Sequence, residues 1–200
     1  MLESHEELGQ VNTESHLGGH NNTTHVDHGA LDWLVKDLKV ETFLDIGCGP
    51  GGMIKAAADL GLRSVGIDGD YSIDRDSNNN FLIHDYTKGP AVIEEQFDVA
   101  WSIEFLEHVY EQYIPNFMHS FQLAKFVVVT YAPPGWTGHH HVNLQEESYW
   151  IDKFQDYHFE YQQELTKHLR SVSTMNYPRK SKKAFVKNRG LFFINRERTQ

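Results

Sequence analysis

The chain has 200 residues, of which 40% are hydrophobic and 23% charged, and these proportions are typical of one soluble globular domain. A formal net charge of −10 argues against general nucleic-acid binding, and no apolar run is long enough to span a bilayer. The single cysteine, Cys48, excludes an internal disulfide and fits a reducing compartment, so we expect a cytoplasmic protein.

The first residues are polar, with scattered His and Asn and no apolar periodicity. This composition predicts a flexible arm or lid over residues 1–28 rather than a core element. The start also lacks the basic and apolar parts of a signal peptide. Residues 29–200 contain neither an internal repeat nor a long linker, so we expect a single domain there.

An alternation of helical patterns and apolar runs follows the arm. Helices are expected over Gly29–Leu38 and Gly52–Leu60 and roughly over Glu107–Leu123. Continuous apolar runs predict strands at Thr42–Ile46, Ser64–Ile67, Phe81–Ile83, Phe97–Ile103 and Lys125–Thr130. Apolar strands that alternate with helices favour a mostly parallel sheet covered on both faces.

The C-terminal part adds a helix expected over Glu146–Tyr157 and a last strand at Leu191–Ile194. Ten Lys or Arg residues lie between Lys167 and the C-terminus. Such a basic segment can meet an anionic substrate, although a solvated surface is its more common meaning.

The first predicted strand runs into FLDIGCGPGG, residues 43–52, so glycines stand between a strand and a helix. Glycine allows backbone conformations that other residues resist, and a helix start offers free N–H groups to a ligand. The spacing fits loops for both dinucleotides and S-adenosylmethionine. Asp45 favours the second, because a carboxylate there would repel a pyrophosphate and attract the ammonium group of a methionine moiety.

Two more acids end successive strands. Asp68 follows the glycine loop by about 20 residues, where a carboxylate can accept from both hydroxyls of an adenosine ribose. Asp85 follows the third strand and can accept from the adenine amino group, whereas Asp70 is expected to be solvated. A single such acid is often a turn cap, but three at successive strand ends predict a binding site.

In combination these motifs resemble those of the class I S-adenosylmethionine-dependent methyltransferases. The segments FLDIGCGPG, VGIDGD, HDYT and FDVAWSIEFLEHV are similar to their first, ribose, adenine and fourth-strand motifs, and the resemblance covers about residues 29–135. It implies a Rossmann-like, doubly wound, mostly parallel seven-stranded α/β sheet with helices on both faces and an antiparallel strand at Leu191–Ile194. It also implies S-adenosylmethionine as cofactor. The expected cofactor contacts are Asp45, Gly47, Gly49, Gly51, Asp68, Asp85, Ser102 and Ile103.

The acceptor is expected beside TYAPPGWTGHHHVN, which follows the fifth strand, because ligands bind at the carboxyl edge of such sheets. His139, His140 and His141 lie in this loop. Together with His108 they are the candidate bases for removing a proton from the acceptor. A histidine run in a loop can also be a solvated chance feature.

The segment IEFLEH, residues 103–108, places Glu104, Glu107 and His108 on one face if a helix begins there. With His141 they form a candidate site for Mg²⁺, Mn²⁺ or Zn²⁺. The pattern resembles the metal site of small-RNA 3′-terminal 2′-O-methyltransferases and is similar to that of the metal-assisted O-methyltransferases of ubiquinone biosynthesis. Leu-Glu-His is also common among class I methyltransferases that use no metal.

We therefore expect an S-adenosylmethionine-dependent methyltransferase that acts on a small-molecule hydroxyl, with O-methylation favoured over N-methylation. Neither nucleic acid nor a membrane is expected as a partner, and the sequence leaves the oligomeric state open.

Two alternatives remain. A 2′-O-methyltransferase for an RNA end, with a divalent metal, would use the basic segment Arg179–Arg189, but the acidic net charge counts against it. A non-catalytic cofactor-binding scaffold is opposed by the intact glycine loop and acids. A dinucleotide oxidoreductase is weaker still, because no Tyr-x-x-x-Lys pair follows the fourth strand.

Overall fold

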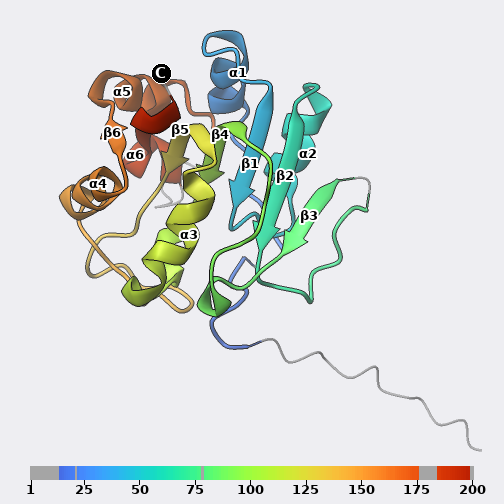
Figure 1. Cartoon of the computed structure of the whole chain (residues 1–200), viewed down its shortest axis with the longest axis vertical. Helices are drawn as coiled ribbons and strands as arrows, with labels where there is room; N and C mark the ends of the chain where they lie inside the picture. Colours follow the sequence, from blue (N-terminus) through green and yellow to red (C-terminus); the bar gives the residue numbers. More distant parts are fainter. Residues whose placement is uncertain (1–13, 21, 78, 176–183, 199–200) are drawn as a thin grey trace, which may run out of the picture.

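Seven strands form one sheet in the computed structural model, which describes residues 14–20, 22–77, 79–175 and 184–198 (Figure 1). The strands are β1 Thr42–Ile46, β2 Arg63–Asp68, β3 Asn80–Ile83, β4 Phe97–Ser102, β5 Ala124–Val129, β6 Phe159–Tyr161 and β7 Leu191–Asn195. Their order across the sheet is β3-β2-β1-β4-β5-β7-β6. The first five are parallel, whereas β7 runs antiparallel to both β5 and β6. This arrangement confirms the predicted Rossmann-like fold, including its antiparallel strand.

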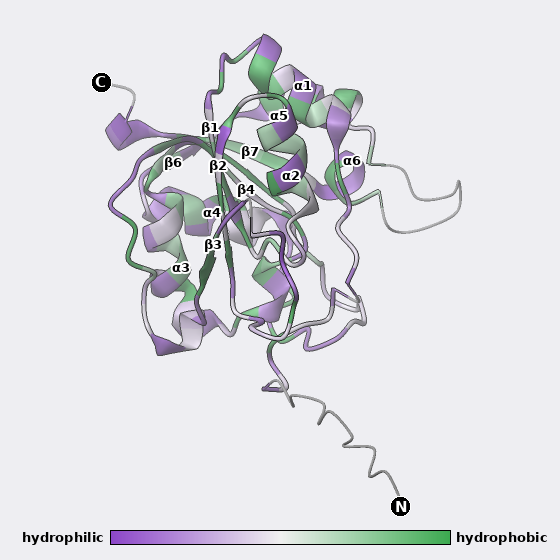
Figure 2. Cartoon of the chain, turned by 90° about the vertical axis from the view of Figure 1, so that its right-hand side faces the viewer, coloured by the Kyte–Doolittle hydropathy of each residue, from purple (hydrophilic) through white to green (hydrophobic). Residues whose placement is uncertain are grey.

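Helices cover both faces of the sheet (Figure 2). They are α1 His28–Lys36, α2 Gly52–Asp59, α3 Ile114–Phe121, α4 Glu147–Asp156, α5 Gln163–Val172 and α6 Phe185–Arg189. Helices α1, α2, α5 and α6 pack on one face and α3 and α4 on the other, each over its own apolar cluster. Successive strand residues point to opposite faces, so Phe43 belongs to the first cluster and Leu44 to the second.

The helix predicted over Glu107–Leu123 is wrong in its first half. Two short 3₁₀ turns, Leu106–His108 and Glu111–Tyr113, precede α3, which begins only at Ile114. Pro115 stands in the first turn of α3, where a missing N–H costs nothing. Proline also disfavours helical backbone in the residue before it, so the helix does not extend further toward the N-terminus. Strand β6 and helices α5 and α6 had not been predicted, whereas the six predicted strands differ from the observed ones by at most one residue at an end.

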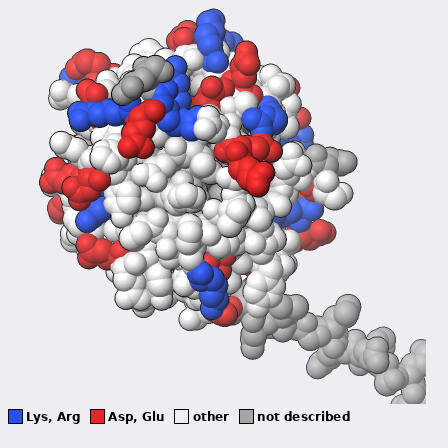
Figure 3. Space-filling view, viewed as in Figure 1, with Lys and Arg blue, Asp and Glu red and all other residues white. Residues whose placement is uncertain are grey.

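Charged side chains of both signs are mixed over the face seen in Figure 3, with Lys and Arg gathered beside Asp and Glu at its upper left. That view shows no continuous basic surface. Within the described ranges, no helix has the length and apolar character that crossing a membrane requires.

Candidate functional site

A cavity of about 950 Å³ opens at the carboxyl edge of the parallel strands, the edge toward which the arrowheads of β1 and β2 point in Figure 1. Its walls come from the glycine loop, the loops after β2, β3 and β4, the histidine loop 136–141 and residues 15–20 and 23–25 of the N-terminal segment. Because parallel strands end at one edge, residues far apart in sequence meet here. The predicted cofactor residues other than Gly51 and Ser102 therefore share one cavity with the predicted catalytic histidines.

The glycine loop needs its glycines for conformation and for space. Gly47, Gly49 and Gly51 have φ angles of +75°, +51° and +86°, in the left-handed region that favours glycine. The backbone N–H groups of Gly47 and Cys48 both donate to the carbonyl of Ile67, at 2.8 and 3.1 Å, which fixes the loop to the end of β2. Gly51 precedes α2 and does not line the cavity.

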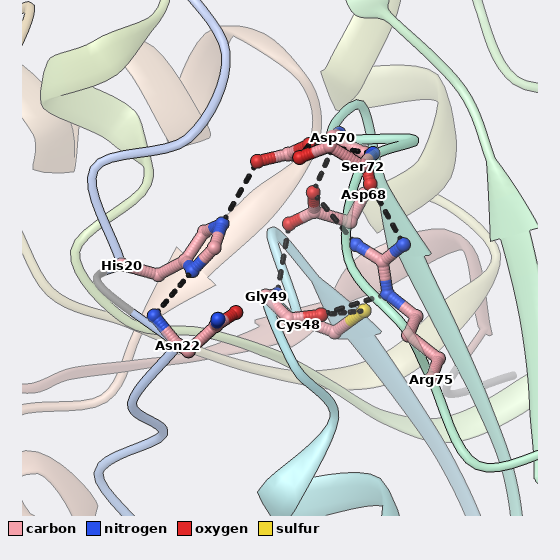
Figure 4. A network of polar contacts seen from close by, with 8 residues as sticks. All are labelled: His20, Asn22, Cys48, Gly49, Asp68, Asp70, Ser72 and Arg75. Atoms are coloured by element: carbon pink, nitrogen blue, oxygen red, sulfur yellow. Dashed lines mark hydrogen bonds and ion pairs between the residues drawn. The ribbon is translucent and has the colours of Figure 1, made fainter. Parts of the chain in front are cut away.

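Asp68 lies at the centre of a polar network around this loop (Figure 4). Its carboxylate accepts from the backbone N–H groups of Gly49 and Asp70, both at 2.8 Å. The Arg75 guanidinium lies 3.0 Å from the same carboxylate as an ion pair and donates to the carbonyls of Gly49 at 2.8 Å and Asp70 at 2.7 Å. Arg75 therefore holds the glycine loop and the loop after β2 together from behind the cavity.

Asp70 is only 4% exposed, so the expectation that it is solvated is wrong. It accepts from the N–H and hydroxyl of Ser72 and from His20 of the N-terminal segment, at 2.8, 2.6 and 3.0 Å. Burial by itself raises the pKa of Asp70, but the hydrogen bonds from Ser72 and His20 together hold that pKa below its usual value.

Asp85 lines the cavity beyond the end of β3 and caps the 3₁₀ turn Tyr86–Lys88. It accepts from the N–H and hydroxyl of Thr87, each at 2.8 Å, and from His16 at 3.1 Å. Burial raises its pKa, whereas the Thr87 and His16 bonds outweigh that effect and lower it, so the carboxylate is ionised. The turn-capping role is thus real, and it leaves the carboxylate at the cavity wall.

Asp45, at the end of β1, is 4% exposed and lines the cavity. Burial raises the pKa of this carboxyl well above its usual value, and the nearby charge of Asp68 raises it further. A ligand cation placed here would lower that pKa again, because it would stabilise the carboxylate.

The two residues expected at the methionine end behave differently. Ile103 lines the cavity. Ser102 is fully buried, and its hydroxyl donates to the carbonyl of Ile46 at 2.8 Å, which ties β4 to β1. Its side chain therefore supports the site rather than facing it.

Glu107, His108 and His141 come together at the acceptor side, with one possible ligand atom from each lying within 4.8 Å of the others. Glu107 is fully buried, and neither carboxylate oxygen has a hydrogen-bond partner among the described residues. Burial and then the neighbouring Glu104 raise the pKa of Glu107 well above its usual value. An unpaired buried carboxylate is costly, and a bound cation would remove that cost.

Backbone contacts, rather than a shared helix face, build this cluster. The carbonyl of Glu107 accepts from the N–H groups of Val142 and Asn143 at 2.9 and 3.1 Å, which joins the histidine loop to the turn after β4. Nδ1 of His141 lies 3.2 Å from the carbonyl of Trp136. When Nδ1 donates to that carbonyl, Nε2 keeps its lone pair for a metal.

The imidazole of His108 is mostly buried. Burial, followed by the neighbouring His141 and His139, lowers the pKa of His108 to about 4. The ring is therefore neutral at neutral pH and has a lone pair for a metal or a proton. Its Nδ1 is buried without a hydrogen-bond partner in the described part of the chain.

Glu104 lies beside the cluster but is not part of it. Its backbone has a φ of +55°, and its carboxylate binds Arg189 at 3.0 Å and the Thr130 hydroxyl at 3.3 Å. Burial raises the pKa of Glu104, while the ion pair with Arg189 opposes that rise. The predicted single face for Glu104, Glu107 and His108 is wrong, because this left-handed residue turns the chain before the 3₁₀ turn begins.

The remaining histidines line the cavity in different ways. The ring of His140 packs against Tyr110, with centroids 5.5 Å apart, and His139 packs against Gly19. Sequence reasoning missed Arg75, Asp70, His16 and His20, which lie in polar segments without periodicity. The one available signal was an arginine set between Asp74 and Asp76.

Comparison with known proteins extends these findings. Residues 44–122 match the model of a family described as a methyltransferase domain, whereas no curated protein sequence matches the chain. The magnesium protoporphyrin IX methyltransferase of Synechocystis PCC 6803, solved with bound S-adenosylmethionine, is similar in structure with a TM-score of 0.58 and 16% identity. That alignment covers 82% of this chain and 76% of the other.

Two further solved structures share the fold. The methyltransferase domain of bacterial CtHen1 has a TM-score of 0.53 and 15% identity over 83% of this chain and 95% of that one. An O-methyltransferase from a trans-AT PKS multienzyme of Brevibacillus brevis, in complex with S-adenosyl-L-homocysteine, has a TM-score of 0.51 and 16% identity over 66% of this chain and 50% of that one. The family match over residues 44–122, the strand order and the glycine loop together support a class I S-adenosylmethionine-dependent methyltransferase.

Proposed function

We propose that this methyltransferase transfers a methyl group to a hydroxyl of a small molecule, with a divalent cation held by Glu107, His108 and His141. The observation that carries the proposal is the fully buried, unpartnered carboxylate of Glu107 beside two imidazoles, as found within the described residues. One carboxylate oxygen and two imidazole nitrogens suit Mn²⁺, Zn²⁺ and related ions. Such an ion supplies Lewis-acid chemistry that eases deprotonation of a bound hydroxyl.

The proposed cofactor side of the cavity is acidic. The carboxylates of Asp45, Asp68 and Asp85 stand at the ends of successive strands, where they suit the ammonium, ribose and adenine groups of S-adenosylmethionine. Gly47 and Gly49 let that ligand approach the backbone. These residues bind and orient the methyl donor. The sulfonium already activates its methyl group, so the protein has no need to activate it further.

Proton removal falls to the histidine loop in this proposal. His139 and His140 line the cavity next to the cluster, so either can accept the acceptor's proton while His108 and His141 hold the cation. Burial, His16 and His139 lower the pKa of His140, so its ring is ready to take up a proton at neutral pH.

The small-molecule assignment rests on charge. The formal net charge of the chain is −10, and a polyanion gains its affinity mainly from basic groups. The basic segment Arg179–Arg189, on which the RNA alternative depends, lies partly outside the described residues. A panel of substrates therefore decides between the two acceptor classes.

The cofactor and the acceptor are tested first. Calorimetry should show binding of S-adenosylmethionine and none of NAD, since the acids repel a pyrophosphate. Labelled methyl transfer should then be assayed on catechols and sugars and on RNA with a free 3′ end. Methylation of RNA alone would overturn the small-molecule assignment, and an N-methylated product would overturn the hydroxyl assignment.

The cation is tested by titration with Mn²⁺ under chelated and metal-loaded conditions. Glu107→Gln and His141→Ala should lose binding, whereas Glu111→Gln, an exposed acid nearby, should keep it. Gly138→Ala is a steric test, because its Cβ would lie 2.2 Å from Nε2 of His141. Equal Mn²⁺ binding by the parent and Glu107→Gln would show that the site does not exist.

A further inference from the structure

The N-terminal segment, of which residues 14–20 and 22–25 are described, lies along the cavity, and residues 15–20 and 23–25 contribute to its wall. The Thr24 hydroxyl accepts from the N–H of Gly52 at 3.0 Å, at the first turn of α2. Asp27, fully buried, then anchors the segment by accepting from Ala30 at the start of α1 and from Ser173 beyond α5. The segment is thus fixed at its end nearest the core.

Two histidines fix the other end to the acids of the cavity. His16 lies 3.1 Å from Asp85, and His20 lies 3.0 Å from Asp70. Figure 4 shows His20 reaching from the segment toward Asp70, which is joined in turn to the network of Asp68. The four side chains of these two pairs are at most 22% exposed, so water screens both contacts only weakly.

The same segment also reaches the acceptor side. Gly18 and Gly19 both have a φ of +90°, and a Cβ on Gly19 would lie 2.9 Å from the His139 ring. The His16 ring centroid is 6.2 Å from that of His140. One stretch of backbone therefore contacts the proposed cofactor acids and the proposed catalytic loop at once.

The histidine contacts leave room for the cofactor. A carboxylate offers about four acceptor positions, and Asp85 uses three of them, for Thr87 N–H, Thr87 hydroxyl and His16. One position stays available for an adenine amino group. His20 binds Asp70, which is not among the proposed cofactor contacts, so neither histidine has to leave when the cofactor binds.

We infer that His16 and His20 are positioning residues that hold the described N-terminal segment, residues 14–20 and 22–25, over the cavity, where it encloses the bound cofactor and fixes the histidine loop. The inference rests on the proposed cofactor site, because Asp85 belongs to it. Its consequence is kinetic. The cofactor can leave only after the segment has moved away from the cavity, so the two histidine contacts slow its dissociation.

The test compares the double variant His16→Ala/His20→Ala with the parent chain and with His119→Ala, an exposed histidine on α3. The probe is S-adenosylhomocysteine, whose dissociation is followed by stopped-flow fluorescence. Loss of one hydrogen bond to a charged group weakens the closed position of the segment about tenfold, so each substitution should speed dissociation by up to that order. Amide exchange of residues 14–20 should also lose its protection by the ligand, and KM for the cofactor should rise more than kcat falls.

The outcomes separate the two proposals. The variant His16→Gln/His20→Gln keeps a donor at a similar reach and should recover most of the slow dissociation, which a purely steric role would not produce. Parent-like dissociation and exchange in the double Ala variant would overturn the inference and leave the proposed function intact. A parent chain that fails to bind the probe would overturn both.

Discussion

Replacement of Arg75 by Met should both destabilise the protein and weaken cofactor binding. The guanidinium is 5% exposed and contacts three groups, namely the carboxylate of Asp68 and the carbonyls of Gly49 and Asp70. Met has a similar length and no donor, so the substitution removes these contacts without leaving a large cavity.

The expected loss of stability depends on the contacts that Asp68 keeps in the variant. Asp68 keeps its two backbone donors, so its charge is not wholly unpaired, and the cost stays below the ~3–5 kcal/mol of breaking a fully buried pair. The variant also loses the two hydrogen bonds to carbonyls. At ~1 kcal/mol per neutral bond and somewhat more per charged one, we expect the free energy of unfolding to fall by about 2–4 kcal/mol. For a chain of this size that corresponds to a decrease of about 5–15 °C in Tm.

The matched control is Arg63→Met. Arg63 also lies over a phenylalanine ring, Phe97 at 5.6 Å, and pairs with an acid, Glu95, but its side chain is 48% exposed. Arg75 lies 5.7 Å from the ring of Phe81. Surface pairs contribute about 0–1 kcal/mol, so the control should be nearly neutral.

The assay is calorimetric titration with S-adenosylhomocysteine, together with thermal unfolding of each variant. Arg75→Met should bind about tenfold or more weakly, because a free-energy loss of about 1.4 kcal/mol at the glycine loop already produces that factor. Arg75→Lys should be intermediate, since an ammonium group cannot contact three groups in one plane. Parent-like Tm and affinity in Arg75→Met would refute the positioning role.

Three further predictions concern buried acids. Because the pKa of Asp45 is raised, binding of S-adenosylmethionine should release a proton, and its affinity should increase as pH rises through that pKa. Calorimetry in buffers of different ionisation enthalpy measures the proton release. A binding enthalpy that does not depend on the buffer would contradict the prediction. Asp27→Ala removes a helix cap and two bonds to residues beyond α5 and should cost about 2–4 kcal/mol in urea unfolding, with Asp27→Asn losing less. Because the folded pKa of Glu107 lies above its unfolded value, the metal-free protein should lose stability as pH rises between the two values, and Glu107→Gln should abolish that slope.

Much of the sheet could be predicted because the strands of a buried parallel sheet are unbroken apolar runs in the sequence. Strand β1 was placed at its observed bounds, and the acids at the cavity were found because each lies at or just beyond the end of such a run. Strand β6 was missed because Phe159–Tyr161 is short and has a charged central residue. Helix α5 was missed in a strongly polar stretch, where few apolar residues mark a buried face.

The cluster of Glu107, His108 and His141 was predicted from a strand end that faces the histidine loop, and the structure brings these three side chains together. The helix face assumed for Glu104, Glu107 and His108 does not form. Backbone N–H groups just after the histidine loop bind the Glu107 carbonyl instead and join the loop to the turn after β4. Such long-range pairing leaves no periodic trace in a sequence. The contacts of His16 and His20 are of the same kind, since their partners lie 69 and 50 residues away.

The single cavity bears on inhibitor chemistry. The acids proposed to bind the donor and the candidate ion ligands His108 and His141 line the same cavity, so one compound could join an adenosine mimic to a chelating group through a short linker. Tethering converts the second contact into an intramolecular one, and avidity gains of about 10²–10⁴ are usual when the linker matches the span. Chelators alone act on many metalloenzymes. A linked compound would draw its selectivity from the particular distance between Asp85 and His141 that this fold sets.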